Sequence, residues 1–206
     1  MPDLTSFTRR DVELVGKETP FRRYFQLDTY YLRHPLFQGG MSPVLQREVF
    51  ERGQSACCLP YDPARDEVVL IEQFRPGALA ADDPRPWLIE APAGIVETGE
   101  TPEEVVRREV QEEAGCTVTD VEFVMDLYPS PGATSERVAM FIGRAATENV
   151  VGIHGLDDEA EDIRVFTLPF AEAIGLVDTG KGQTAAGAIL LLWLAQHRDA
   201  LRAKWT

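Results

Sequence analysis

The chain has 206 residues, of which 44% are hydrophobic, so it can bury the core of one large domain or of a domain with a small extension. Its 34 acidic and 20 basic residues give a formal net charge of −14. A charge of this sign disfavours binding to nucleic acid or to anionic lipid through a basic surface, and we expect neither as a partner.

The cysteines and the apolar segments indicate the cellular compartment of the protein. Cys57, Cys58 and Cys116 offer neither the even number of a disulfide framework nor a C-x-x-C spacing, which favours reduced, packed thiols. The N-terminal residues contain no apolar signal core, and the longest apolar run, at residues 188–195, is too short to cross a bilayer. We therefore expect a cytoplasmic protein without a membrane role.

Extended segments dominate the first 53 residues. The sequences VELV, FQLDTYYL and VLQREVF alternate polar and apolar residues or are β-rich, and the pairs HP and GG signal turns between them. These patterns predict a small antiparallel β domain over residues 1–53. A hairpin follows, because SACCLPY and EVVLIEQF flank the turn sequence DPARD, and a polar, proline-rich segment then leads to a short strand in WLIEAP.

The next predicted element is a helix with well-defined ends. Thr101 has the properties of an N-cap, Glu104 completes a T-x-x-E capping box, and Gly115 supplies the C-terminal stop. Further strands are predicted in VEFVMDLY, RVAMFIGRA and IRVFTL, followed by one helix that starts near Pro169 and a longer one over residues 183–202. Strands and helices are interspersed without a regular βαβ repeat, so we expect an α+β fold with a mixed sheet.

Three glutamates crowd the end of the first helix. Glu109, Glu112 and Glu113 are spaced i, i+3 and i+4, and each like-charged pair costs roughly 0.2–0.5 kcal/mol, with a further penalty from the helix dipole. In one interpretation the helix has a solvated acidic face, supported by an i, i+4 pair between Glu104 and Arg108. A helical wheel instead places the three acids beside the buried side. In the other interpretation the carboxylates bind Mg²⁺ or Mn²⁺, which favour oxygen ligands and share them with substrate phosphates.

The segment GIVETGETPEEVVRREVQEEAGC at residues 94–116 resembles the Nudix box, the signature of the Nudix hydrolase family. The single departure is Cys116, where the family usually has a larger aliphatic residue. The matching positions are Gly94, Glu100, Arg108, Glu109, Val110, Glu112, Glu113 and Gly115. The resemblance implies a Nudix fold over residues 54–206, which is an α/β/α sandwich on a mixed sheet.

A wider resemblance, to the bacterial ADP-ribose pyrophosphatases of this family, extends over nearly the whole chain. It runs through FERG, LIEQFR, SPGATSE and GLDDEAEDIRV, and Pro131 lies sixteen residues after Gly115, as in that subfamily. The resemblance implies hydrolysis of ADP-ribose to AMP and ribose 5-phosphate, through water attack at the adenosine-side phosphorus. The alternatives are hydrolysis of another nucleoside diphosphate sugar such as GDP-mannose, and a non-catalytic ADP-ribose sensor. Sensors tend to lose box acids, and this chain keeps all of them.

By the same resemblance, the acidic residues divide between metal binding and catalysis. Mg²⁺, with Mn²⁺ as a substitute, would be bound by the carbonyl of Ala93 and the carboxylates of Glu109, Glu113 and Glu161. Arg108 would hold a carboxylate in position, and Glu159 would act as the general base. Glu112 lies close to the same metals and is the alternative base. Without the resemblance, the cluster GLDDEAEDI that contains Glu159 and Glu161 is more typical of a solvated turn.

Positive side chains that could contact phosphate or ribose are scarce in this acidic chain. A guanidinium can contact two phosphate oxygens at once. The candidates are Arg47, Arg52 and Arg75. The alternative, which applies more to Arg52 than to Arg75, is a structural ion pair with Glu48, Glu51 or Glu72.

Other candidate substrate contacts come from two further segments. Tyr24 either stacks on the adenine ring or packs within its own hairpin, and the resemblance implies contacts from Ser130 and Gly132 of SPGATSE. The predicted β domain is too small to hold a good core alone, and in similar enzymes this segment packs across a partner subunit and completes its substrate site. We therefore expect a homodimer in which Tyr24 and Arg47 act at the partner's site.

Overall fold

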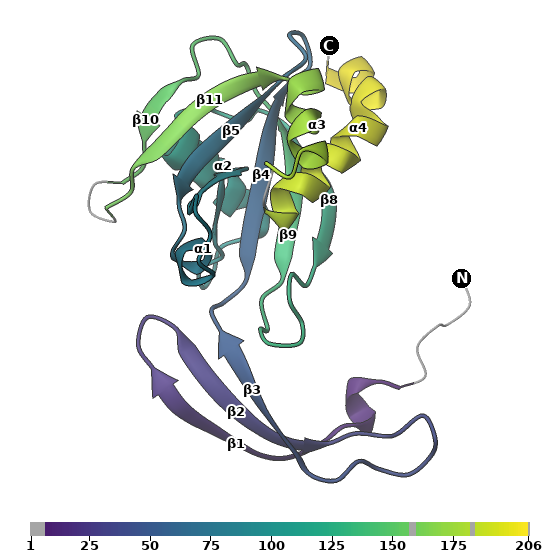
Figure 1. Ribbon diagram of the computed structural model, residues 1–206. Helices are drawn as coiled ribbons and strands as arrows, with labels where there is room; N and C mark the ends of the chain where they lie inside the picture. The colour runs from purple at the N-terminus through teal and green to yellow at the C-terminus, as the bar shows by residue number, and fades with distance from the viewer. Residues whose placement is uncertain (1–6, 157–159, 182–183, 206) are drawn as a thin grey trace. The chain divides into compact units, whose positions relative to one another are not determined.

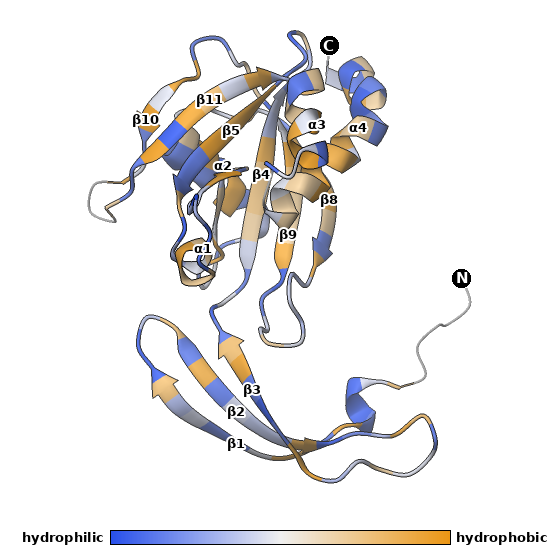
Figure 2. Ribbon diagram, viewed as in Figure 1, coloured by the Kyte–Doolittle hydropathy of each residue, from blue (hydrophilic) through white to orange (hydrophobic). Residues whose placement is uncertain are grey.

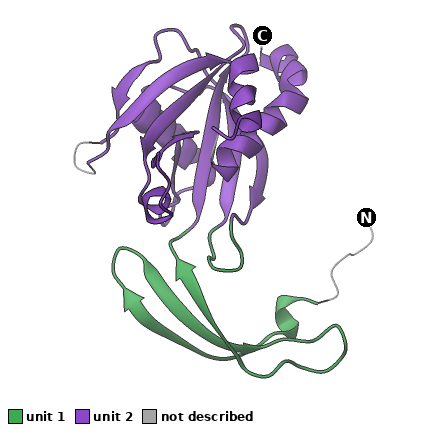
Figure 3. Cartoon of the chain, in the orientation of Figure 1, with its two compact units in different colours: residues 1–53, 130–136 green, residues 54–129, 137–206 purple. Residues whose placement is uncertain are grey.

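The computed structural model describes residues 7–156, 160–181 and 184–205. The chain divides into two compact units (Figure 3). Unit 1 comprises residues 1–53 with 130–136, and unit 2 comprises residues 54–129 with 137–206. The segment 130–136 therefore groups with the N-terminal unit, although its neighbours in the sequence on both sides belong to unit 2.

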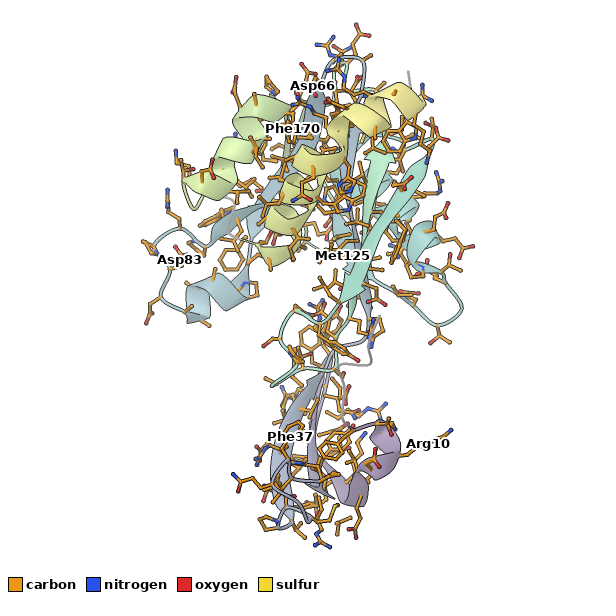
Figure 4. All side chains as sticks on the ribbon, turned by 90° about the vertical axis from the view of Figure 1, so that its right-hand side faces the viewer. Arg10, Phe37, Asp66, Asp83, Met125 and Phe170 are labelled. Carbon is orange, nitrogen blue, oxygen red and sulfur yellow. The ribbon has the colours of Figure 1, made fainter. Side chains whose placement is uncertain are left out.

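Unit 1 is a three-stranded antiparallel sheet preceded by one 3₁₀ turn. Its elements are η1 (Arg9–Asp11), β1 (Glu13–Arg22), β2 (Gln26–Arg33) and β3 (Leu45–Glu51), with β2 in the centre. The three predicted extended segments are thus confirmed. The buried residues that the structure describes in this unit are polar, and among them Asp28 pairs with Lys17 at 2.6 Å. Many apolar side chains are exposed, as Phe37 is with 86% of its surface (Figure 4), while others such as Phe25 and Leu27 are half-buried.

Unit 2 is built on an eight-stranded mixed sheet. Its strands are β4 (Ser55–Asp62), β5 (Glu67–Phe74), β6 (Trp87–Glu90), β7 (Ala93–Ile95), β8 (Val121–Leu127), β9 (Val138–Arg144), β10 (Gly152–His154) and β11 (Ile163–Pro169). The main path runs β10-β11-β5-β4-β9-β8, while β6 pairs with β5 and β7 pairs with β4 (Figure 1). Strands β4 and β9 are parallel and the other pairs are antiparallel, so the sheet is mixed as predicted.

Helices cover both faces of this sheet. They are α1 (Pro76–Ala80), α2 (Pro102–Ala114), α3 (Phe170–Asp178) and α4 (Ala185–Trp205). Ile71 of β5 packs in one apolar cluster with valines of α2, and Leu70 packs in the other with leucines of α4. Because successive residues of a strand point to opposite faces, α2 covers one face and α3 and α4 cover the other. Figure 2 shows the apolar residues along β5 and β9 between these layers, which confirms the α/β/α sandwich.

Short elements account for the differences from the predicted order. Helix α1 lies at the start of the proline-rich segment, for which no helix was predicted, and β7 and β10 are three-residue strands. Elements of this length show no hydrophobic periodicity, so the sequence does not reveal them.

The predicted hairpin is confirmed, since β4 and β5 are antiparallel around the DPARD turn. The Phe170 backbone N–H donates to the Asp66 carbonyl at 2.9 Å, which joins this turn to the start of α3 (Figure 4). Among the described residues, no helix combines the length and apolar character that crossing a bilayer requires.

Candidate active site

Helix α2 carries the candidate metal ligands, and both of its ends are fixed as the sequence predicts. The Thr101 side chain accepts from the Glu104 backbone N–H, and the Glu104 carboxylate accepts from the Thr101 N–H at 2.7 Å. Gly115 ends the helix in the left-handed conformation, with φ of 61°, which glycine adopts without a steric penalty. These caps fix the register of the acids in the last turns.

The three acids of α2 border the buried side of the helix. Glu113 is buried, while Glu109 and Glu112 are partly exposed. Arg108 donates from Nη1 to Glu109 at 2.7 Å and to Glu112 at 3.1 Å. Its Nε and Nη2 atoms donate to Glu100, whose carboxylate also accepts the Glu97 N–H. The i, i+4 pair between Glu104 and Arg108 considered above does not form. The Arg108 guanidinium instead donates to Glu109 and Glu112 of the helix and to Glu100 of the preceding loop.

Glu113 is held at the sheet by neutral donors alone. Its Oε2 atom accepts the Ala93 backbone N–H at 2.8 Å, and Nε2 of Gln73 lies 3.5 Å from its Oε1 atom. Burial, together with the neighbouring charges of Glu109 and Glu161, raises the pKa of Glu113 to about 8, although the Ala93 N–H and the charge of Arg75 oppose this rise. Burial also raises the pKa of Glu109, although Arg108 opposes this. The cluster is therefore short of positive charge.

The donor set fits a hard divalent cation. Carboxylate oxygens close to one another, on a rigid helix, are typical ligands for Mg²⁺ and Mn²⁺, and positive charge there would relieve the repulsion that raises both pKa values. Over residues 7–156, 160–181 and 184–205, no group of three His, Cys, Asp or Glu side chains already converges as such a site. The side chains are instead turned toward Arg108 and the Ala93 N–H, so binding would require them to reorient.

The acidic loop after β10 is attached to the C-terminal end of α2. The Gly155 N–H donates to the Glu112 carbonyl at 3.3 Å, and the His154 ring lies against Gly115, where an added Cβ would be 2.3 Å from Cε1. The Glu161 carboxylate accepts the Leu156 N–H at 3.0 Å. The expected general base, Glu159, lies outside the described residues.

Arg75 lies where β5 ends, and its partner was not anticipated. Its Nε donates to Glu90 of β6 at 2.7 Å, whereas the expected partner Glu72 instead accepts from Nε of Arg164 at 2.7 Å. Burial raises the pKa of Glu90, and Arg75 opposes this. A lone acid in the apolar strand WLIEAP is the signal by which the sequence could have revealed Glu90, because a buried charge needs a partner.

The remaining candidate contacts belong to unit 1. Tyr24 sits at the turn between β1 and β2 with 84% of its surface exposed, and its ring packs edge-on against Phe25 with the ring centroids 4.7 Å apart. Arg47 is exposed on β3 and donates to the carbonyl of Gln46 at 2.7 Å. Arg52 forms an ion pair, but with Glu136 at 3.1 Å and not with the partners considered above.

A cleft of about 430 Å³ in unit 1 is lined by Tyr24 and Arg52 together with Lys17, Arg22 and Arg23. Asp28 and Glu51 also line the cleft, and Lys17 pairs with Asp28 and Arg52 with Glu136, so its basic side chains outnumber its acidic ones but two of them are already paired. Ser130 and Gly132 lie in the exposed segment that groups with this unit. The predicted site residues thus fall into two sets: Arg75, Ala93, Arg108, Glu109, Glu112, Glu113 and Glu161 in unit 2, and Tyr24, Arg47, Arg52, Ser130 and Gly132 in unit 1.

Comparisons with known proteins place the chain among proteins of one family. The model of the NUDIX domain family matches residues 51–187. A protein named ADP-ribose pyrophosphatase, from Escherichia coli (strain K12), is 47% identical over 200 residues that cover 97% of this chain and 95% of that protein. A protein named GDP-mannose pyrophosphatase, from Enterobacter sp. (strain 638), is 38% identical over 152 residues that cover 72% of this chain and 77% of that protein.

A solved structure shares the fold. It is described as the crystal structure of an ADP compounds hydrolase and aligns with a TM-score of 0.68 at 22% sequence identity, covering 94% of this chain and 100% of that one.

Proposed function

Because the chain belongs to the Nudix family, we propose that it hydrolyses the diphosphate of ADP-ribose to AMP and ribose 5-phosphate. The observation that carries the proposal is the buried acidic cluster of α2, in which Glu109, Glu112 and Glu113 are all present and Arg108 holds two of them. A protein that only senses its ligand has no need of such a cluster. The relative that is 47% identical over nearly the full length points to ADP-ribose as the substrate.

The metal would be bound between the C-terminal half of α2 and strand β7. Its ligands would be the Ala93 carbonyl, Glu109, Glu113 and Glu161. When bound, Mg²⁺, or Mn²⁺ in its place, supplies positive charge to the diphosphate oxygens and makes a water molecule more acidic.

The chain's own residues then position the reactants. Arg108 keeps the carboxylates of Glu109 and Glu112 next to each other on α2, and they turn from its guanidinium toward the metal when it binds. Glu159 accepts the proton of the water that attacks the adenosine-side phosphorus, with Glu112 as the alternative acceptor. Gly155, which precedes the segment of Glu159 in the sequence, is attached to α2 by its hydrogen bond to the Glu112 carbonyl.

Substrate recognition would draw on both units. Arg75 contacts the diphosphate from the end of β5, while Arg47, Arg52, Ser130 and Gly132 contact phosphate and ribose and Tyr24 stacks on the adenine. The fully buried side chains of unit 1 that the structure describes are polar, and many of its apolar side chains remain exposed. This supports a homodimer, in which residues 1–53 pack on the partner and complete its site while residues 54–206 form the hydrolase domain.

The three cysteines are buried and free, which favours a reducing compartment, and we place the protein in the cytoplasm.

A panel of nucleoside diphosphate sugars tests the function directly. Purified protein with Mg²⁺ is given ADP-ribose, GDP-mannose and a UDP-sugar, and the released AMP, GMP or UMP is separated by chromatography. We expect AMP from ADP-ribose as the main product. Faster release of GMP would favour the second candidate, which the relative named GDP-mannose pyrophosphatase supports. Binding of ADP-ribose without any release would favour a sensor.

A further inference from the structure

A buried polar network joins Arg75 to helix α2 through strands β5 and β6. Glu90 pairs with Ile71 in the register of the two strands, and Gln73 is the next β5 residue on the same face, which is the face that α2 covers. Glu90 accepts from Nε of Arg75 at 2.7 Å, and the side-chain amide of Gln73 is near enough to oppose the rise in the pKa of Glu90 that burial causes. The same amide nitrogen lies 3.5 Å from Oε1 of Glu113. The Gln73 amide is therefore a neighbour of both carboxylates.

In the described part of the chain, this network uses only the Nε atom of the Arg75 guanidinium and leaves its terminal nitrogens able to donate to a ligand. Gln73 and Glu90 are less than a tenth exposed, whereas 40% of the Arg75 side chain is exposed. Among the described residues, Glu90 is the only one to which the Arg75 side chain donates a hydrogen bond, and the donor is Nε. The two terminal nitrogens keep their donors for another partner. A bidentate ion pair would use two guanidinium N–H groups, whereas Glu90 accepts from Nε alone among the hydrogen bonds of Arg75 to described residues.

We propose that Glu90 is a positioning residue, which holds the inner edge of Arg75 and, through Gln73, keeps the guanidinium and the Glu113 carboxylate at a fixed spacing. The inference rests on the proposed function, in which Arg75 contacts the diphosphate and Glu113 binds the metal. A long side chain that is already ordered loses less conformational entropy on binding. Glu90 therefore acts on substrate affinity through Arg75 and touches no reacting atom itself.

The first test follows Arg75 itself and needs no substrate. The Arg75 Nε–H signal is identified in NMR spectra by its absence from Arg75→Lys, and its exchange with water is measured. We expect slow exchange in the wild type and in Glu90→Gln, which keeps an acceptor, and fast exchange in Glu90→Met. Equal protection in Glu90→Met would overturn the proposal. Melting temperatures establish that each variant is folded, and Glu90→Gln provides the comparison if Glu90→Met is not.

The second test is a double-mutant cycle on ADP-ribose hydrolysis. We expect Glu90→Met to raise KM about tenfold, with kcat changed less than about threefold, and to have almost no further effect in the Arg75→Lys background. The control is Glu72→Met, which removes the preceding acid of β5 whose partner is Arg164, and KM should be unchanged. The full KM increase in the Arg75→Lys background would assign Glu90 a structural role independent of Arg75.

The third test concerns the link to Glu113. Calorimetry with Mn²⁺ alone should show weaker binding in Gln73→Met than in the wild type, and unchanged binding would remove Gln73 from the proposal. If the wild type released no AMP, the proposed function would fail, while NMR exchange and Mn²⁺ binding would still decide whether Glu90 and Gln73 hold their partners.

Discussion

The carboxylate of Glu109 occupies the space in which any other residue at position 94 would place its Cβ. A Cβ built on Gly94 would lie 1.7 Å from Oε1 and 2.6 Å from Cγ of Glu109. Glycine is thus needed here for close approach between β7 and α2, and the backbone of Gly94 lies outside the left-handed region, so its conformation alone does not demand glycine.

We expect Gly94→Ala to displace the Glu109 carboxylate and to weaken Mg²⁺ activation by about tenfold or more, as the loss of a metal ligand's position does. The melting temperature should change little, because the end of the Glu109 side chain can rotate toward solvent. The matched control is Gly175→Ala in α3, where an added Cβ meets nothing within 4 Å. Mg²⁺ titrations of the hydrolysis rate measure the effect, and an unchanged Mg²⁺ requirement would contradict this role of Gly94.

The raised pKa of Glu113 makes the stability of the metal-free protein depend on pH. In the folded state this pKa is about 8, against an ordinary value of 4.5. The folded state therefore binds the proton more tightly than the unfolded state, and this contribution is fully present below the ordinary pKa and is lost as the pH rises toward 8. The loss should be on the order of a few kcal/mol.

We expect the melting temperature in EDTA to fall more steeply between pH 5 and pH 8 for the wild type than for Glu113→Gln, because the amide does not titrate. Glu109 and Glu90 also have raised pKa values, but they are common to both proteins and cancel in the comparison. Added Mg²⁺ should stabilise the wild type more as the pH rises, since it binds the deprotonated carboxylate. Parallel slopes for the two proteins would contradict the assignment.

The identity of the general base can be decided by two substitutions made side by side. We expect Glu159→Gln to lower kcat by about 10²–10⁴, with little change in KM or in the Mg²⁺ requirement, and to remove the acidic limb of the pH–rate profile. Glu113→Gln should instead raise the Mg²⁺ concentration for half-maximal rate. If kcat falls little in Glu159→Gln but falls strongly in Glu112→Gln, and Glu112→Gln still binds Mn²⁺, then Glu112 of the helix is the general base.

The contribution of unit 1 to a partner's site can be tested by mixing two impaired variants at an Mg²⁺ concentration too low for Glu113→Gln to turn over. Arg47→Ala removes a candidate substrate contact from unit 1, and Glu113→Gln removes a candidate metal ligand from unit 2. In a dimer that shares its sites, each mixed dimer has one intact site, so a refolded equimolar mixture should recover about one quarter of the wild-type rate. If the mixture recovers no activity although light scattering gives the mass of a dimer, Arg47 and Glu113 of one subunit would act at the same site. A monomer mass with full activity would exclude the dimer.

Local patterns in the sequence predicted the helix that carries the site. The capping residues Thr101 and Glu104 and the stop at Gly115 depend only on neighbours along the chain, so the position of the acids on α2 followed from them. The placement of Glu113 beside the sheet followed from the helical wheel for the same reason.

Contacts between distant segments could not be predicted in this way. The partner of Arg52 is Glu136, which is far away in the sequence, and the partner of Arg75 depends on the register between β5 and β6. The contact of His154 with Gly115 likewise requires β10, a strand too short to show a pattern. The sequence therefore predicted where the acids lie on the helix but not which neighbours hold the arginines.

The most direct test of the account is the release of AMP from ADP-ribose by the wild type and by Glu113→Gln, each measured in EDTA and after addition of excess Mg²⁺. The account predicts no turnover in EDTA, full recovery of the wild type with Mg²⁺, and recovery of the variant only at a much higher Mg²⁺ concentration. Undiminished turnover in EDTA, or the same Mg²⁺ dependence in both proteins, would contradict a metal-dependent hydrolase built on the carboxylates of α2.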